Sequence, residues 1–93
     1  LTSIISRNSE AIYTQIDHDM VMLEPKSMLF CHVNPIGMAL WSLLKENALS
    51  LEALCKHIHQ HYEVTKAQCV KDVRQFIKEM VALNLLIVID VTQ

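Results

Sequence analysis

Apolar and polar residues alternate in short runs between residues 11 and 33 of the chain. Strand-forming residues dominate three short runs there, at residues 11–16, 20–24 and 28–33. The segments between these runs have turn composition. The first segment contains Asp17 and Asp19, and the second contains Pro25, which suits the second position of a turn. Because both connections are short, the pattern predicts three strands joined as an antiparallel meander.

From residue 34 onward, apolar residues recur three and four positions apart. This spacing predicts three helices, over residues 35–44, 51–62 and 66–83. Asn34, Ser50 and Thr65 precede these helices and are good N-cap residues, and Pro35 suits the first helical position. Asn84 can end the third helix, since asparagine tolerates the left-handed conformation usually given to glycine.

The order of three strands and then three helices predicts an α+β domain, winged-helix-like, with a three-stranded antiparallel sheet. Residues 1–10 have no clean period and predict a flexible N-terminal arm before a folded domain over residues 11–88. Residues 89–93 are expected to be a C-terminal tail. The apolar run 85–91 has strand character, which leaves a homodimer open.

The only glycine of the chain, Gly37, lies in the first turn of the first predicted helix. Glycine costs a helix about 1 kcal/mol relative to alanine. The helix tolerates this cost if another backbone must come close at that position. We therefore expect a tight crossing within the fold there, in preference to direct contact with a ligand.

Composition and charge narrow the class of protein. The chain has 93 residues, 52% of them hydrophobic and 19% charged, which suits one small domain with a core of its own. The formal charge of -2, without a block of like charges, argues against a nucleic-acid partner. No run approaches the roughly 18 apolar residues that span a bilayer, so no membrane partner is expected. Three cysteines without a CxxC pair predict free thiols in a reducing cytoplasm.

Two motifs carry a resemblance to a known family. The first comprises Val33, Asn34, Gly37, Trp41, Leu43 and Leu44. The second comprises Asp72, Val73, Phe76, Ile77, Met80, Asn84, Leu85 and Leu86. In their order and spacing, over roughly Val21 to Val88, they resemble the PqqD-like family of peptide chaperones, also described as RiPP recognition elements. Asn84 departs from that pattern, because the family usually has glycine there.

The resemblance implies a non-catalytic module that holds the leader segment of a ribosomally made precursor peptide and presents it to a modifying enzyme. In the family, the leader adds as a strand to the edge of the third strand, beside the third helix. The residues expected to bind the peptide here are, on the strand, Met28, Leu29, Phe30, Cys31 and His32, and on the helix, Cys69, Val73 and Phe76, with Lys66, Asp72 or Arg74 at the rim. The three apolar helix residues fit core packing equally well, and helical phase does not say which rim faces the strand.

Other candidate chemistry is weaker. His57 and His61 lie one helical turn apart, a two-ligand spacing, but no third ligand follows, so a solvated helix flank is preferred to a metal site. Cys31 and His32 are adjacent on a strand and point to opposite faces, which argues against a thiol nucleophile. We therefore expect no catalytic residues, no metal and no cofactor.

Two alternatives remain. A winged-helix domain can place a helix in the major groove of DNA, and Lys71, Arg74 and Lys78 share one side of the third helix. Asp72 and Glu79 lie beside them, however, and would repel phosphates. An oligomerisation domain built on residues 85–91 is the other alternative, and it could coexist with peptide binding.

Overall fold

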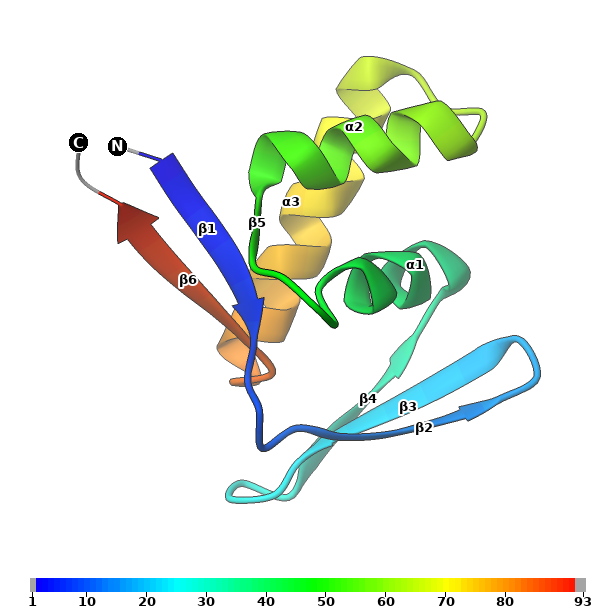
Figure 1. Cartoon of the computed structure of the whole chain (residues 1–93). Coiled ribbons are helices and arrows are strands. Elements are labelled where there is room, and N and C mark those ends of the chain that lie inside the picture. Colours follow the sequence, from blue (N-terminus) through cyan, green and yellow to red (C-terminus); the bar gives the residue numbers. More distant parts are fainter. Residues whose placement is uncertain (1, 92–93) are drawn as a thin grey trace.

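The computed structural model describes residues 2–91 of the chain. Three α-helices pack in the angle between two antiparallel sheets, which lie on different sides of the molecule (Figure 1). The helices are α1 (Pro35–Leu43), α2 (Leu51–His61) and α3 (Lys66–Ala82). The strands are β1 (Thr2–Arg7), β2 (Ile12–Ile16), β3 (Asp19–Glu24), β4 (Leu29–Val33), β5 (Leu49–Ser50) and β6 (Leu86–Val91). The predicted α+β class is confirmed, although "winged-helix-like" describes it only loosely.

The first sheet is the expected meander, in the order β2-β3-β4. Its two connections are tight: Asp17 between β2 and β3, and Met28 before β4, both have positive φ angles, of 54° and 61°. The Glu24 carboxylate stabilises the second turn by accepting hydrogen bonds from the backbone N–H groups of Lys26 and Ser27, each at 2.9 Å. Because β3 lies in the middle, β4 is an edge strand.

The second sheet, in the order β5-β1-β6, corrects the prediction at both ends of the chain. Residues 1–10 were expected to form a flexible arm, but Thr2–Arg7 pairs with β6 along its whole length. The expected tail, residues 89–93, likewise begins inside β6, which runs Leu86–Val91. The two strands stabilise each other although they are far apart in sequence, which local periodicity does not reveal. Residues 1, 92 and 93 lie outside the described residues.

The helix ends follow the predicted chemistry. The side chains of Asn34, Ser50 and Thr65 each accept the backbone N–H three residues later, at 2.8, 3.1 and 3.1 Å. Asn84 ends α3 with a φ of 60°, and the N–H of Leu85 donates to the carbonyl of Met80 at 2.9 Å. This is the closing pattern of a Schellman motif, with asparagine in the glycine position.

The core lies where the helices meet both sheets. Its fully buried side chains are Ile5, Met20, Met22, Leu40, Trp41, Leu54, Ile58, Cys69, Val73, Leu85 and Leu86. Trp41, only 1% exposed, also joins the two sheets through Arg7 of β1. The guanidinium of Arg7 lies 4.2 Å from the centre of the Trp41 ring, and Tyr13 of β2 packs edge-on against that ring at 5.6 Å. Arg7 also donates from Nε to the Trp41 carbonyl at 2.9 Å.

Among the described residues, no helix is both long and apolar enough to cross a membrane.

Candidate functional site

Three consecutive residues at the start of β4, on one edge of the first sheet, have strongly exposed apolar side chains. Met28 is 66% exposed, Leu29 52% and Phe30 73%. In the described structure β4 pairs with β3 only, so its other side presents backbone groups without a strand partner. Apolar side chains beside unpaired backbone are the two features that an incoming peptide strand uses.

A groove runs along one side of α3, and its other wall is formed by β4 and by the start of α1. It consists of two adjoining pockets, of about 290 and 80 Å³, that share Asn34, Phe76 and Glu79. The remaining lining residues are Cys31, His32, Val33, Ile36, Gly37, Asp72, Gln75, Met80 and Leu83. We call this the β4–α3 groove.

The phase of α3 decides which residues reach this groove. Asp72, Phe76, Glu79 and Leu83 recur three or four positions apart and therefore share one side of the helix. This side faces β4 at Phe76, Glu79 and Leu83, and the start of α1 at Asp72. Phe76 is half-buried and is the only aromatic residue among them. The structure thus answers what helical periodicity alone left undecided, namely which rim of α3 accompanies the strand edge.

Gly37 allows α1 and α3 to approach each other at one end of the groove. A Cβ atom on Gly37 would lie 2.6 Å from Cγ1 of Val33 and 2.8 Å from Cε1 of Phe76. Both distances are shorter than real carbon contacts. The expected tight crossing is therefore present, and side chains, rather than another backbone, fill the space that the missing side chain leaves.

The polar side of the groove is acidic. Asp72 accepts a hydrogen bond from Nε2 of Gln68, and Glu79 accepts one from Nε2 of Gln75, both at 2.8 Å. These amide donors orient the carboxylates without neutralising them. The groove therefore favours ligands that carry positive charge or hydrogen-bond donors along this side.

Cys31 is not set up as a nucleophile. Burial, and then the neighbouring Glu79 carboxylate, raise the pKa of its thiol. Its Sγ contacts Sδ of Met80 at 3.8 Å, whereas Nε2 of His32 lies 3.3 Å from the Asp19 carboxylate. Because burial and the Glu79 carboxylate both disfavour the thiolate, the thiol stays protonated near neutral pH.

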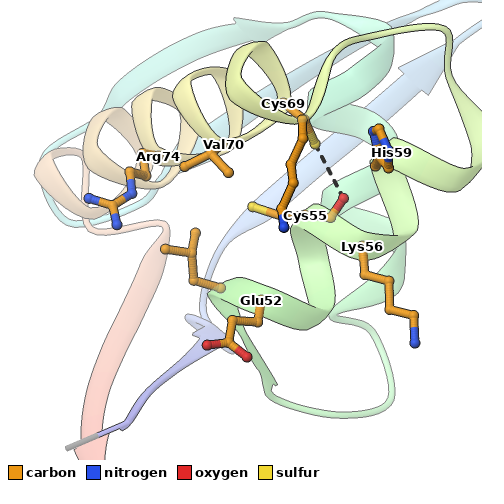
Figure 2. A pocket seen from close by; sticks show the side chains of 9 residues that line it. Glu52, Cys55, Lys56, His59, Cys69, Val70 and Arg74 are labelled. Atoms are coloured by element: carbon orange, nitrogen blue, oxygen red, sulfur yellow. Dashed lines mark hydrogen bonds between the residues drawn. The ribbon is translucent and has the colours of Figure 1, made fainter.

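The predicted site residues divide into four places. Cys31, His32, Asp72 and Phe76 meet in the β4–α3 groove, and Met28, Leu29 and Phe30 lie on the exposed part of the chain that leads into it. Val73 is fully buried in the core. Lys66, Cys69 and Arg74 line a different pocket, between α2 and α3 (Figure 2).

Sequence interpretation missed four groove residues on α3 or at its end, namely Gln75, Glu79, Met80 and Leu83. Their spacing from Asp72 and Phe76 was the available signal, since residues three, four and seven positions apart share a helix side. The signal became usable only once the side of α3 that faces β4 was known.

The histidines of α2 form a local pair. The rings of His57 and His61 stack with centroids 4.1 Å apart, and Nδ1 of His61 lies 2.9 Å from the His57 carbonyl oxygen. Burial, and then His61, lower the pKa of His57. Over residues 2–91, no group of three or more His, Cys, Asp or Glu side chains is placed to hold a metal ion.

Comparison with known proteins gives a family and two structural neighbours. The family model described as Coenzyme PQQ synthesis protein D (PqqD) matches residues 19–86. One neighbour is TbiB1 in complex with the TbiA(beta) leader peptide, with a TM-score of 0.77 and 23% identity over 87% of this chain and 93% of that one.

The other neighbour is a lasso peptide synthetase B1 complexed with the leader peptide, with a TM-score of 0.75 and 17% identity over 89% of this chain and 96% of that one. At these identities the likeness establishes the fold. No curated protein matches the chain.

Proposed function

The chain belongs to the PqqD family, and from this premise we propose that it binds the leader segment of a ribosomally synthesised precursor peptide and presents it to a modifying enzyme. One observation carries the proposal. The edge strand β4, with its exposed apolar side chains, lies beside a groove whose far wall is α3. Both structural neighbours are described as complexes with leader peptides, which supports the same function.

Binding by strand addition follows from the chemistry of the edge. A leader in extended conformation gains main-chain hydrogen bonds to β4, and these bonds do not depend on its sequence. Because side chains alternate along a strand, every second leader residue faces the groove. There it meets Phe76, Met80 and Leu83, whose apolar surfaces select for apolar leader residues.

The protein contributes binding and no catalysis of its own. Cys31 and His32, the side chains that come nearest to a nucleophile and base at the site, make separate contacts, to Met80 and Asp19. The module instead raises the local concentration of the precursor near the enzyme that modifies it. Three free thiols, Cys31, Cys55 and Cys69, support a cytoplasmic setting.

The test is an NMR titration of the isotopically labelled protein with leader peptides encoded near its gene. We expect saturable binding, with shifts concentrated in residues 28–33 and on the side of α3 that carries Asp72, Phe76 and Glu79. No binding by any neighbouring leader, with the fold intact, would contradict the proposal. Shifts confined to β2, at the opposite edge of the same sheet, would contradict the site.

A matched pair of variants separates the peptide site from general surface effects. Phe30→Ala removes a side chain that is 73% exposed beside the groove, and Ile16→Ala removes one that is 66% exposed on β2. Truncating a central interface aromatic costs about 1–2 kcal/mol, or roughly tenfold in Kd. We expect this loss for Phe30→Ala only. An equal effect of both variants would contradict the placement of the leader on β4.

Homodimer formation is a second candidate role, supported by β6. This strand lies at the edge of the second sheet, with Ile87, Val88 and Ile89 each more than 40% exposed. Pairing of two β6 strands across a two-fold axis would cover them. Light scattering of Ile89→Lys against the unmodified protein tests this role, and a monomeric mass for both would exclude it.

A further inference from the structure

A second groove lies on the side of α3 away from β4. It is formed by two adjoining pockets, of about 700 and 450 Å³, that share Leu51 and Arg74. The larger lies between α2 and α3 (Figure 2), and the smaller continues along α3 towards β1 and β6. The lining residues are Ser3, Ile5, Leu51, Glu52, Cys55, Lys56, His59, Lys66, Cys69, Val70, Arg74, Ile77, Lys78, Val81 and Val88. We call it the basic groove.

The rim of this groove concentrates positive charge on a chain whose net charge is -2. Lys56, Lys66, Arg74 and Lys78 line it, against one carboxylate, that of Glu52. These cations are half of the eight Lys and Arg residues of the whole chain. Among the side chains that the structure describes, no carboxylate oxygen lies within 4.0 Å of any of these four cations. Their charge is therefore available to a partner.

The floor of the groove is apolar and uncharged. Val70, Ile77, Val81 and Val88 contribute aliphatic surface along its length. Cys55 adds a thiol whose pKa is raised by burial, so it remains neutral. A ligand that fills this groove must bring apolar side chains for the floor together with negative charges for the rim.

We propose that the basic groove docks an acidic, apolar peptide segment of the modifying enzyme. The proposal rests on the proposed function for the identity of this partner. A nucleic-acid backbone would satisfy the cations but leave the aliphatic floor exposed to water, whereas a segment that mixes Glu or Asp with Leu-like residues satisfies both.

The charges of the two grooves keep the two partners apart. The β4–α3 groove carries the carboxylates of Asp72 and Glu79, which repel an acidic segment. The basic groove attracts it on the other side of the same helix. Leader and enzyme can therefore bind at once without competing for one surface.

The first experiment uses two synthetic peptides of the same length, one of Glu and Leu at helical spacing and one with every Glu replaced by Lys. Each is titrated into the labelled protein by NMR. We expect the acidic peptide to shift residues lining the basic groove, with a Kd that rises with salt, and the basic peptide not to do so. Equal shifts by both peptides, shifts only at the β4–α3 groove, or no binding would overturn the proposal.

Charge reversal provides the second experiment, with Lys66→Glu and Arg74→Glu combined. Both side chains are exposed, so the fold should persist, which circular dichroism checks. Each exposed ion pair is worth up to about 1 kcal/mol, so the double variant should weaken the acidic peptide by roughly tenfold. Lys26→Glu combined with Lys45→Glu makes the same charge change at two exposed positions outside the groove and is the control. An equal loss in the control would overturn the proposal.

Finally, the enzyme encoded beside the gene is co-purified with the unmodified protein, with the Lys66→Glu and Arg74→Glu variant, and with its control. We expect loss of the enzyme only with the groove variant, while leader affinity stays unchanged. If the protein binds the leader and the groove variant still co-purifies with the enzyme, only this inference is refuted. Loss of leader binding in every sample would instead refute the proposed function. Tight binding of duplex DNA that displaces the acidic peptide would reassign the groove to nucleic acid.

Discussion

Replacing Gly37 with alanine tests how the fold shapes the peptide site. The added Cβ would lie 2.6 Å from Cγ1 of Val33 and 2.8 Å from Cε1 of Phe76, so both side chains must move. Overpacking of this kind costs about 1–3 kcal/mol. The greater helix propensity of alanine offsets up to about 1 kcal/mol of this cost. We therefore expect a net loss of about 1 kcal/mol or somewhat more, which for a domain of this size lowers Tm by about 4–8 °C per kcal/mol.

The assay is urea unfolding followed by the fluorescence of Trp41, the only tryptophan and a buried one. Comparing Ser42→Ala with Ser42→Gly, at an exposed position of the same helix, measures the change in propensity without crowding. If Gly37→Ala stabilised the protein as much as that pair differs, the contact with Val33 and Phe76 would not limit the structure. This result would refute the reasoning.

A double-mutant cycle identifies the contact itself. Val33→Ala removes Cγ1, the atom that would lie nearest to the new methyl group. In that background Gly37→Ala should cost less than it does alone, because the crowding is relieved. Because Phe76 also lines the β4–α3 groove, its displacement by Gly37→Ala should weaken leader binding as well.

Three further predictions concern stability. Trp41→Ala should cost about 3–5 kcal/mol, since the side chain is fully buried, and an unchanged Tm would show that the core has been misidentified. Asn34→Ala removes the cap of α1 and should cost about 1 kcal/mol in urea unfolding, whereas a change below a few tenths would argue against the cap. The Lys26 N–H, with help from that of Ser27 and against the effect of burial, lowers the pKa of Glu24. The stability that the ionised Glu24 contributes is complete above the ordinary glutamate pKa and is lost as the pH falls through the lowered pKa of the folded protein. The Tm difference between the unmodified protein and Glu24→Gln should therefore shrink in acid. A difference that does not change with pH would show that the carboxylate is unimportant.

Local chemistry predicted most of the fold because it acts over a few residues. Asn34, Ser50 and Thr65 cap their helices as their types suggest, and Asn84 takes the left-handed conformation at the end of α3. Strand β1 was missed for the complementary reason. Its partner β6 comes more than 70 residues later, so the hydrogen bonds that make it a strand leave no local pattern.

The candidate site was predictable only in part. The edge strand followed from the family resemblance, together with the order of the three strands. The choice among Lys66, Asp72 and Arg74 did not, because all three lie on one helix and only the packing of α3 separates them. Asp72 lines the β4–α3 groove, opposite the start of α1, whereas Lys66 and Arg74 line the pocket between α2 and α3. Helical periodicity specifies which residues share a side but not what that side contacts.

The exposed start of β4 has a cost for the protein without its peptide. The unpaired edge of β4, with the exposed side chains of Met28, Leu29 and Phe30, can pair with the same edge of a second copy of the protein as well as with a leader. Colloidal stability should therefore be lowest for the free protein at high concentration and should rise when the edge is occupied. Precursor peptide made in the same cell would then protect its own carrier from aggregation, so the yield of soluble protein would follow the supply of substrate.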